Sequence, residues 1–527
     1  MSSSPPLRII AAAPLALTLG AFTGLGFQPI GWWWTTILGF GGFVLMLRHL
    51  RPRRAFGIGY LYGLGFFGMT VWYVVNFGWW IPLLLVGFLA LWGALSGWAT
   101  AWTATRMPSL WWLAAAASWT ATEWAAQRVP FGGFCWSRFV YTTTDQPLGG
   151  LLPIVGAGGV SFLVALTGAS LACAAASPAW RRRLMPLILA ASLLLIGGVA
   201  RFWPAPPSSN SMRVGMIQGN VDSTADAFSM GYPRAVTAMH LSQTIMALAN
   251  WRTSNTPLPD MIVWPENSAD TDPTQDQITY DMVSAASDMS GLPMLVGVLS
   301  LGPGDDERAT TALWWLPGQG PVQRVDKRNL APFGERVPMY SILGKIVPMT
   351  QRVGRQSVPG TKPGVFHVEV DGGQSLTIGN IICYELAYDS TVYDTVRNGA
   401  QLMTVQSSNV SFNGTWQPYE QFAITRVRAM ELRRWLVVTT TASISGLIDP
   451  HGKVIDSTAE RTGDFRLYSV PLGDGITPGV YIGPWFERLI SVLAALGVLW
   501  GMIGAWSQNR KTKLSVKSTN QNTRSDF

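Results

Sequence analysis

The chain has 527 residues, of which 48% are hydrophobic, and a formal net charge of +8 at pH 7. This length allows more than one domain. Its 3 cysteines and 4 histidines show no CxxC spacing and no histidine pair, which argues against a disulfide framework and against a metal site. Outside the polar middle of the chain, the basic residues form short clusters between apolar runs. That pattern is typical of membrane topology signals and not of a nucleic-acid partner.

The composition divides the chain into distinct parts. Residues 1–205 are dominated by Ala, Leu, Gly, Trp and Phe, and residues 212–475 have the composition of a soluble domain. Residues 485–507 are apolar again, and residues 508–527 are basic and rich in Ser and Asn. We therefore expect a membrane domain, one large aqueous domain, a closing membrane helix and a disordered polar tail.

About eight segments are long and apolar enough for membrane helices, which need about 20 mostly apolar residues each. Their cores are residues 9–27, 30–47, 57–77, 81–103, 109–126, 151–176, 184–200 and 489–506. A lone arginine, Arg8, precedes the first segment, as in a cleavable signal peptide. No convincing cleavage site follows, so we expect this segment to remain a helix.

Clusters of basic residues predict the orientation of the chain. These clusters are His49, Arg51, Arg53 and Arg54; Arg106; Arg181, Arg182 and Arg183; and Arg510, Lys511, Lys513 and Lys517. If about eight segments span the bilayer, every cluster falls on the same side as Arg8, and the positive-inside rule identifies that side as the cytoplasm. Both termini are then cytoplasmic, and residues 212–475 lie on the extracytoplasmic side of the cell membrane.

The loop of residues 130–141 is expected on the same side as the large domain. It is aromatic, glycine-rich and cationic, which suits the headgroup region of the bilayer. Arg138 and the nearby Trp136 are candidate lipid-binding residues, with Arg138 facing a lipid phosphate. An amphipathic connecting segment with no ligand is an equal alternative. Glu123 lies near the end of a predicted span, so we expect it at the membrane interface.

From residue 212 onward the hydrophobic period changes. Strands are predicted at residues 212–219, 261–264, 294–300, 312–316, 322–324, 375–383, 402–406 and 435–440, and helices at residues 233–249, 276–290, 390–398 and 420–431. Nearly continuous apolar strands that alternate with helices predict an α/β domain whose sheets are covered by helices.

Several of these strands end on side chains that can do chemistry. One apolar strand runs into Cys383, and another leads through a proline to Glu266. Lys327 follows a third strand and precedes a Pro/Gly-rich loop that contains Glu335. Taken alone, each has an ordinary explanation, as a core cysteine, a solvated acid and a surface cation.

Together these residues form a set suited to acyl transfer. A thiol is a strong nucleophile only as the thiolate, so Cys383 needs a base. Glu266 is suited to accept its proton, and Lys327 to stabilise negative charge on the thiolate and on a tetrahedral oxyanion. The backbone N–H of Tyr384, directly after the thiol, is a natural oxyanion donor. We therefore expect an enzyme that forms a thioester on Cys383.

The order Glu, Lys, Cys, each at a strand end, resembles the nitrilase or carbon-nitrogen hydrolase superfamily. That resemblance implies an α-β-β-α sandwich of two sheets. Several membrane spans before such a domain and one after it resemble the apolipoprotein N-acyltransferase family over nearly the whole chain. The motifs that carry this resemblance are Trp264-Pro265-Glu266, Lys327 with Pro332-Phe333-Gly334-Glu335-Arg336-Val337-Pro338, and Cys383-Tyr384-Glu385.

The resemblance implies an enzyme that moves an acyl chain from a membrane phospholipid, through its cysteine, to the N-terminal amine of a diacylglyceryl-cysteine lipoprotein. The cycle would be ping-pong and need no external cofactor, because a phospholipid ester is already activated for thiol attack. The resemblance assigns supporting roles to Glu335 and Glu385, which would position Lys327 and the loops around the thiol. Residues 408–412, Ser-Asn-Val-Ser-Phe, depart from the family's commoner Ser-Asn-Asp and tryptophan pattern, so no role is carried over to the departing positions.

Two other functions are open to such a chain. A membrane-tethered amidase or nitrilase would use the same triad with water as the acyl acceptor. A binding or transport protein would use its spans as a path, but such paths usually contain ionisable residues, and the predicted span cores hold almost none besides Glu123. Replacing Cys383 with alanine separates the enzymes from a binding protein, which should be indifferent to the change.

Overall fold

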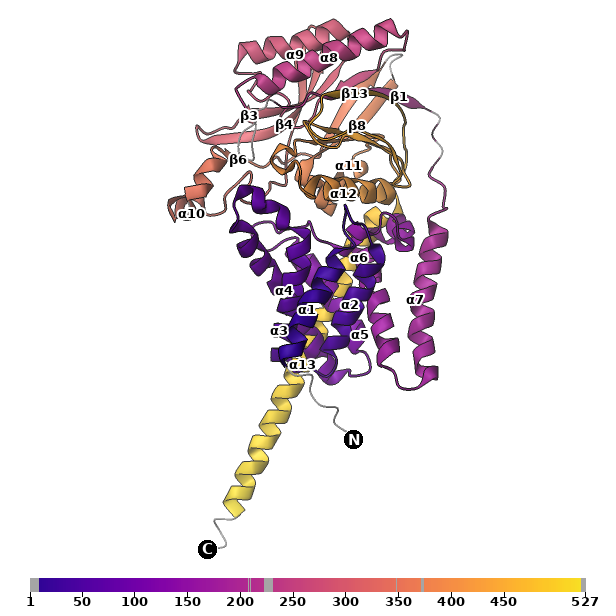
Figure 1. Ribbon diagram of the computed structural model, residues 1–527, viewed down its shortest axis with the longest axis vertical. Helices are drawn as coiled ribbons and strands as arrows, with labels where there is room; N and C mark the ends of the chain where they lie inside the picture. The colour runs from indigo at the N-terminus through magenta and orange to yellow at the C-terminus, as the bar shows by residue number, and fades with distance from the viewer. Residues whose placement is uncertain are drawn as a thin grey trace.

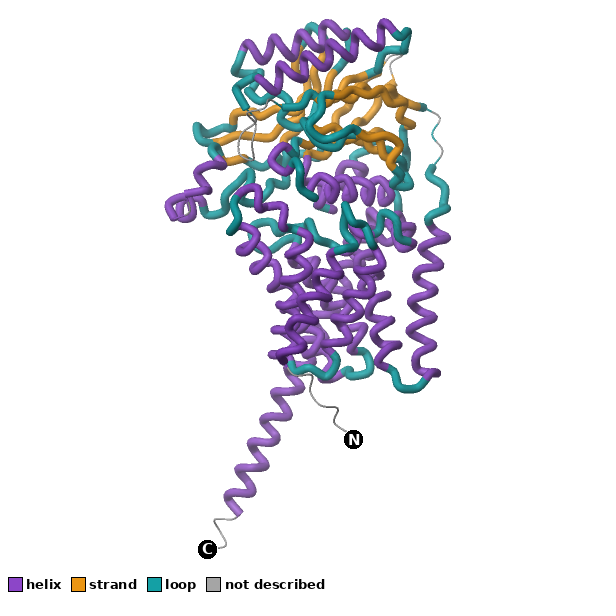
Figure 2. The backbone as a smooth tube through the Cα atoms, in the orientation of Figure 1, coloured by secondary structure: helices purple, strands orange, loops and turns teal. Residues whose placement is uncertain are grey.

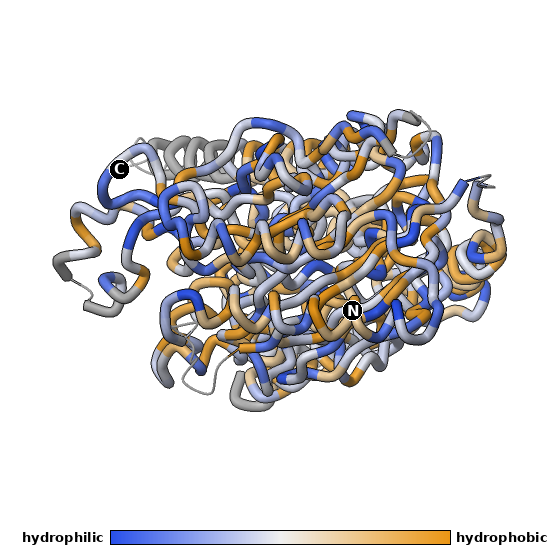
Figure 3. The backbone as a smooth tube through the Cα atoms, turned by 90° about the horizontal axis from the view of Figure 1, so that it is seen from above, coloured by the Kyte–Doolittle hydropathy of each residue, from blue (hydrophilic) through white to orange (hydrophobic). Residues whose placement is uncertain are grey.

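The computed structural model describes residues 9–206, 208, 210–221, 231–346, 348–370 and 374–522. Arg8 and residues 523–527, on which part of the topology and tail predictions rest, lie outside the described residues. A bundle of helices forms one end of the molecule and a domain of strands and helices forms the other (Figures 1 and 2). Seen from above, apolar stretches run through the middle of the molecule (Figure 3).

The helical end contains a helix in each of the segments predicted to be apolar spans. Its helices are α1 (Ile9–Gly24), α2 (Trp33–Leu47), α3 (Pro52–Thr70), α4 (Ile81–Arg106), α5 (Trp111–Ala126), α6 (Leu152–Ala176), α7 (Trp180–Ala200) and α13 (Pro478–Asn522). Within the described part of the chain, 4 helical segments are long and apolar enough to cross a membrane, at Ile81–Arg106, Pro147–Ala176, Trp180–Ala200 and Pro478–Ser507. A total of about eight spans therefore stays a prediction.

Small residues allow the membrane helices to approach closely. A Cβ atom on Gly59 of α3 would lie 2.3 Å from the backbone oxygen of Gly93 in α4, and one on Gly41 of α2 would lie 2.8 Å from the oxygen of Gly168 in α6. Helix association in a bilayer depends on this kind of backbone contact, because the lipid is as apolar as the side chains.

Two predicted segments differ from the structure. The predicted span at residues 57–77 is shorter, because α3 ends at Thr70 and the chain turns into the 3₁₀ helix η1 (Trp72–Phe77). The polar tail, expected to be disordered, continues α13 as far as Asn522. No Gly or Pro occurs between Trp506 and Asn522, so nothing in the sequence stops the helix from propagating once it has formed.

Two sheets form the other end of the molecule. The first has the order β13 (Asp464–Pro471), β1 (Ser211–Gln218), β2 (Met261–Val263), β3 (Met294–Leu301), β4 (Glu307–Leu316) and β5 (Gly320–Asp326), with β6 (Gln356–Ser357) also paired to β4. The second has the order β12 (Val454–Ser457), β11 (Gly446–Ile448), β10 (Leu436–Thr440), β9 (Leu402–Ser407), β8 (Gln374–Ile382) and β7 (Val365–Val370). The strands in the middle of both sheets are parallel, namely β1, β2 and β3 in the first and β8, β9 and β10 in the second.

Helices cover the outer face of each sheet. Helices α8 (Ala235–Thr253) and α9 (Gln277–Ser290) lie over the first sheet, and α11 (Asp389–Arg397) and α12 (Gln417–Leu432) lie between the second sheet and the membrane helices (Figure 1). Between the sheets, Val214 and Val263 of the first pack in one apolar cluster with Ile378 and Val437 of the second. The α-β-β-α sandwich is therefore confirmed.

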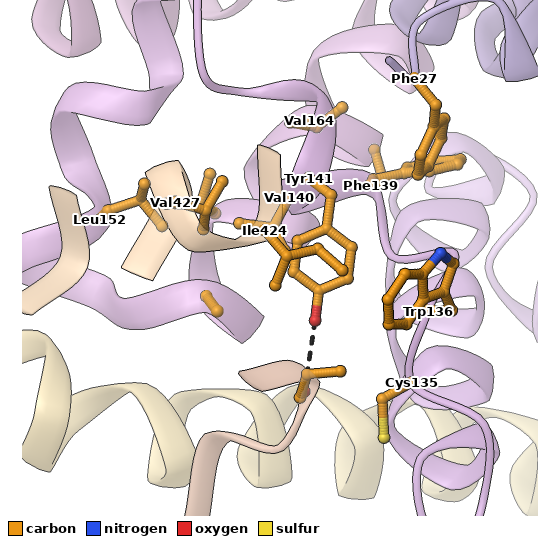
Figure 4. Close-up of a cluster of buried hydrophobic side chains, with 14 of the residues drawn as sticks. Phe27, Cys135, Trp136, Phe139, Val140, Tyr141, Leu152, Val164, Ile424 and Val427 are labelled. Carbon is orange, nitrogen blue, oxygen red and sulfur yellow. Dashed lines mark hydrogen bonds between the residues drawn. The ribbon is translucent and has the colours of Figure 1, made fainter. Parts of the chain in front are cut away.

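The membrane helices and the sandwich share one apolar core. Phe139, Val140 and Tyr141, from the connection between α5 and α6, lie with Ile424 and Val427 of α12 in a single buried cluster (Figure 4). The Tyr141 hydroxyl also donates a hydrogen bond to the backbone oxygen of Ala387, at 3.3 Å. The loop expected in the headgroup region is thus packed between the two domains.

Candidate active site

The thiol of Cys383 is presented by a sharp turn at the end of β8. The strand ends at Ile382, and Cys383 itself has a φ of 52°, in the left-handed region, before the 3₁₀ helix η5 (Cys383–Ala387) begins. Residues other than glycine rarely adopt this backbone conformation. It costs roughly 1–3 kcal/mol and persists only where the surrounding structure enforces it. Cys383 is half-buried, so the turn holds a partly accessible sulfur at the strand end.

Lys327 lies between two carboxylates. Its Nζ donates to Glu266 Oε1 at 3.0 Å and to Glu335 Oε1 at 2.9 Å, and the lysine side chain is only 2% exposed. Burial by itself would lower the pKa of Lys327, but the charges of Glu266 and Glu335 hold that pKa well above its ordinary value. Lys327 is therefore a fixed cation in a poorly solvated site.

Glu266 is held by the loops at the ends of neighbouring strands. Its second oxygen, Oε2, accepts a hydrogen bond from the backbone N–H of Ser408 at 2.9 Å, and its backbone oxygen accepts one from Thr441 Oγ1 at 3.0 Å. A Cβ atom on Gly297 of β3 would lie 2.1 Å from the backbone oxygen of Pro265, so only glycine allows the Glu266 segment to lie this close to the sheet.

Glu335 and Glu385 hold the loop that follows Lys327 by hydrogen bonds to its backbone. Glu335 Oε2 accepts from the backbone N–H of Ala331 at 2.7 Å. Glu385 Oε1 accepts from the backbone N–H groups of Arg328 and Asn329, at 2.6 and 3.1 Å. Its Oε2 accepts from the N–H of Ile382, at 3.2 Å. Glu385 thus ties the lysine loop to the turn that carries the thiol.

The surroundings of Cys383 favour the neutral thiol at rest. Removal from water raises its pKa above the ordinary value, and the charge of Glu266 raises it further, while the charge of Lys327 opposes both. The sulfur also lies 3.9 Å from Oδ1 of Asn409. A neutral thiol beside a carboxylate needs that carboxylate as a base before it can attack.

Asn409 is the residue at the thiol that sequence reasoning missed. It has a φ of 56° at the turn after β9, where the Ser-Asn pair follows a predicted strand. Asparagine is enriched at left-handed positions, so this turn was a detectable signal. The contact of Asn409 with a thiol 26 residues away in the chain left no such signal in the sequence.

Tyr384 places an aromatic ring next to the nucleophile. The ring stacks on Trp136, with centroids 6.0 Å apart and planes 13° apart, and packs edge-on against Tyr388. Tyr384 is 8% exposed, so its ring belongs to the junction between the two domains. The predicted role of its backbone N–H as an oxyanion donor stays a prediction.

The structure corrects the expectation for Trp136 and Arg138. Arg138 is 2% exposed and pairs with Asp389 at 2.7 Å and with Glu487 of α13 at 3.2 Å, so its charge is already neutralised inside the protein. Trp136 is 4% exposed and donates from Nε1 to Glu420 Oε2 at 2.6 Å. The loop is folded beneath the sandwich, so both side chains are buried in protein contacts and do not face lipid.

Glu123, predicted at the membrane interface, is buried inside the protein. It is 8% exposed, and its Oε1 accepts hydrogen bonds from Trp119 Nε1 at 2.9 Å and from the backbone N–H of Phe139 at 3.0 Å. It fastens the domain-connecting loop to α5. Its depth in the bilayer stays a prediction. Over the residues that the structure describes, no group of three or more His, Cys, Asp or Glu is arranged to hold a metal ion.

Comparisons with known proteins agree with this two-part architecture. Residues 19–170 match the model of the apolipoprotein N-acyltransferase N-terminal domain, and residues 260–474 match that of carbon-nitrogen hydrolase. Glu266, Lys327 and Cys383 all fall inside the second match.

Similar proteins cover nearly the whole chain. A protein named apolipoprotein N-acyltransferase from Mycolicibacterium smegmatis is 31% identical over 515 residues, which is 92% of this chain and 84% of that protein. One of the same name from Nitrosomonas europaea is 28% identical over 527 residues, 96% of this chain and 99% of that protein. A solved Saccharomyces cerevisiae member of the nitrilase superfamily, 15% identical, covers 54% of this chain and 95% of its own, with a TM-score of 0.36. This chain belongs to the apolipoprotein N-acyltransferase family.

Proposed function

We propose that this protein transfers an acyl chain from a membrane phospholipid to the N-terminal amine of a diacylglyceryl-cysteine lipoprotein, through a thioester on Cys383. The observation that carries the proposal is the placement of Lys327 between Glu266 and Glu335, 3.0 and 2.9 Å from their oxygens, at the strand end next to the thiol. Membership of the family supports a lipoprotein as the acceptor.

In the first half of the cycle, Glu266 takes the proton from Cys383 Sγ, and the thiolate attacks the ester carbonyl of the phospholipid. The carbonyl oxygen becomes an oxyanion. Two of the three Lys327 N–H groups are bonded to carboxylates, which leaves the third, with the backbone N–H of Tyr384, to stabilise that oxyanion. Collapse breaks the ester bond, and the lysophospholipid alkoxide leaves with the proton held by Glu266.

In the second half, the α-amino group of the lipoprotein attacks the thioester carbonyl. Glu266 now accepts a proton from the amine, the carbon–sulfur bond breaks, and the proton returns to the thiolate of Cys383. The amide product leaves and the enzyme is restored. Glu335 and Glu385 keep Lys327 and its loop in place through both halves, by the contacts at Ala331, Arg328 and Asn329.

The membrane domain supports the same assignment. Both proposed substrates carry acyl chains and lie in the bilayer, and the thiol lies at the junction between sandwich and helices, where Tyr384 meets Trp136. We place residues 212–475 outside the cytoplasm and both termini in it, with about eight spans, on the distribution of basic residues.

The test is intact-mass spectrometry of the full chain in phospholipid nanodiscs, followed by addition of a diacylated lipopeptide with a free N-terminal amine. We expect a hydroxylamine-sensitive acyl adduct that the lipopeptide discharges. The adduct should be absent in Cys383→Ala and present in Cys173→Ala, a matched control, since Cys173 is also a half-buried free cysteine. Discharge by water alone would instead identify an amidase-type hydrolase, and no adduct under any condition would remove the thioester from the proposal.

A further inference from the structure

Two segments next to the active-site thiol are in contact with the membrane domain. The first contains Tyr384, which directly follows Cys383. Its ring stacks on Trp136 of the connection between α5 and α6, with centroids 6.0 Å apart. The two planes differ by only 13°, so the rings lie nearly parallel and stack with an offset. A movement of Trp136 would therefore be passed to the residue whose backbone N–H we assign to the oxyanion.

The second segment contains Asn409. Its Oδ1 lies 3.9 Å from the sulfur, and it precedes η6 (Val410–Phe412). Phe412 packs edge-on against Tyr73 of η1, with centroids 5.6 Å apart and planes at 86°. Asn76 of the same η1 segment donates to the backbone oxygen of Ser411 at 3.1 Å.

The two contacts are joined inside the membrane domain. Tyr73 and Trp136 lie with centroids 6.3 Å apart and planes at 62°, so Tyr384, Trp136, Tyr73 and Phe412 form a continuous chain of aromatic rings. Tyr73 and Trp136 are each 4% exposed. Phe412, which packs against Tyr73, completes the aromatic chain.

A buried acid fixes the orientation of Trp136. Glu420, in the first turn of α12, is 4% exposed and accepts the hydrogen bond from Trp136 Nε1 at 2.6 Å. Burial raises the pKa of Glu420 well above its ordinary value, and the hydrogen bond from Trp136 offsets this only in part. Glu420 thus holds the indole by accepting its N–H in a buried position.

We infer that Trp136 and Tyr73 are positioning residues for acyl transfer: through Tyr384 and Phe412, they set the oxyanion donor and Asn409 relative to the sulfur. This inference rests on the proposed function. Displacing a reacting group by about 1 Å can cost 100-fold in rate, so a distant ring can affect chemistry by holding the backbone in place. The alternative is that the rings only stabilise the domain junction by packing.

The test compares two reactions of the same sulfur. Alkylation of Cys383 by iodoacetamide requires the thiolate but no oxyanion donor, whereas thioester formation from phospholipid requires both. In Trp136→Ala, we expect single-turnover thioester formation to fall about 100-fold, the usual effect of losing one oxyanion donor. The alkylation rate should stay within about threefold of the parent, and the midpoint of its pH profile should not move. Neither quantity depends on the oxyanion donor.

Conservative variants separate positioning from stability. Trp136→Phe keeps the stacked ring and should recover most of the thioester rate. Glu420→Gln keeps an acceptor for the indole and should resemble the parent, whereas Glu420→Leu should resemble Trp136→Ala. Phe139→Ala is the matched control, since Phe139 is 0% exposed at the same junction but its ring packs against Phe40, Phe66 and Trp119, outside this aromatic chain.

Each outcome decides the inference. Equal thioester rates in Trp136→Ala and the parent, or an equal loss in Phe139→Ala, would reduce the rings to packing and overturn the positioning role. A loss of alkylation in proportion to acylation would show that Trp136 acts on the thiol itself and not on the oxyanion, which also overturns it. If the parent acquires no acyl adduct while its thiol still alkylates, the thioester proposal has failed, and this inference fails with it.

Discussion

Lys327 and Glu266 form an ion pair with 3.0 Å between Nζ and Oε1, and the two side chains are only 2% and 4% exposed. An ion pair so removed from water is costly to leave half-formed, because the remaining charge has no solvent to compensate it. Lys327 and Glu266 are also the proposed oxyanion stabiliser and general base. Loss of either side chain should therefore lower both the stability of the protein and its rate of acyl transfer.

The first prediction concerns Lys327→Met. Removing the ammonium leaves two neighbouring carboxylates without their common partner, so we expect a loss of roughly 3–5 kcal/mol in stability, typical of breaking a buried pair. Thioester formation should fall by at least 100-fold, because an oxyanion-stabilising group is lost. Thermal unfolding and single-turnover intact-mass measurements give the two values. A variant that kept the parent's acylation rate would show that the oxyanion is stabilised elsewhere.

The second prediction concerns the pH dependence of Cys383 reactivity. Burial and Glu266 raise the pKa of the thiol, so alkylation of the parent should increase with pH and reach its midpoint above that of an ordinary thiol. Glu266→Gln removes a negative charge and should lower this midpoint. The same variant should acylate more slowly, because it lacks the base. Iodoacetamide rates between pH 6 and about 10, read by mass spectrometry, check the sign, and a midpoint that rises in Glu266→Gln contradicts it.

The third prediction concerns Glu385. Glu385→Ala leaves the N–H groups of Arg328 and Asn329 without their acceptor in a half-buried position, which should cost about 0.5–1.5 kcal/mol for each group. Glu385→Gln retains one oxygen and should lose less. Both variants should also acylate more slowly, because the Lys327 loop is no longer tied to the thiol turn. Chemical denaturation in detergent measures the first effect, and equal stability of the two variants would argue against the hydrogen bonds as its cause.

The fourth prediction concerns the buried pairs at the domain junction. Arg138→Met should destabilise the protein by about 3–5 kcal/mol, since two buried ion pairs are broken and Glu487 is left with only the exposed Arg128 as a counter-charge. Arg128 is a matched control: it is 40% exposed and lies 3.9 Å from the same Glu487, so Arg128→Met should cost less than about 1 kcal/mol. Removing the counter-charge as well, in Arg138→Met with Glu487→Leu, should restore part of the loss. Equal melting temperatures for the two single variants would contradict this account.

Local patterns predicted the strands that carry the site, because each is an apolar run followed by a polar side chain. Thus β2 leads to Glu266, and β8 ends at Ile382, next to Cys383. The strands missed were β6, β7, β11, β12 and β13, which are short or half-exposed, so their local pattern is weak. Strand β13 also gains its partner from a distant part of the chain. In β13, Pro471 pairs with Ser211, a contact that no local periodicity contains.

Arg138 shows the same limit for a single side chain. Its sequence surroundings are aromatic and cationic, which is typical of a lipid-facing loop. Its actual partners, Asp389 and Glu487, lie 251 and 349 residues further along the chain. Local sequence therefore predicts that a charge needs compensation but not which group provides it.

The pairing of β1 with β13 also has a consequence for biosynthesis. Strand β1 is the first of the sandwich to leave the ribosome and β13 the last, and the register joins Ser211 to Pro471. Until almost all of the sandwich has been synthesised, one edge of β1 is unpaired and open to association with other strands. Helix α13 begins at Pro478, soon after β13, so formation of the closing helix and completion of the sheet are nearly simultaneous. A nascent chain stalled before residue 464 would carry an exposed strand edge, a substrate for chaperones and proteases.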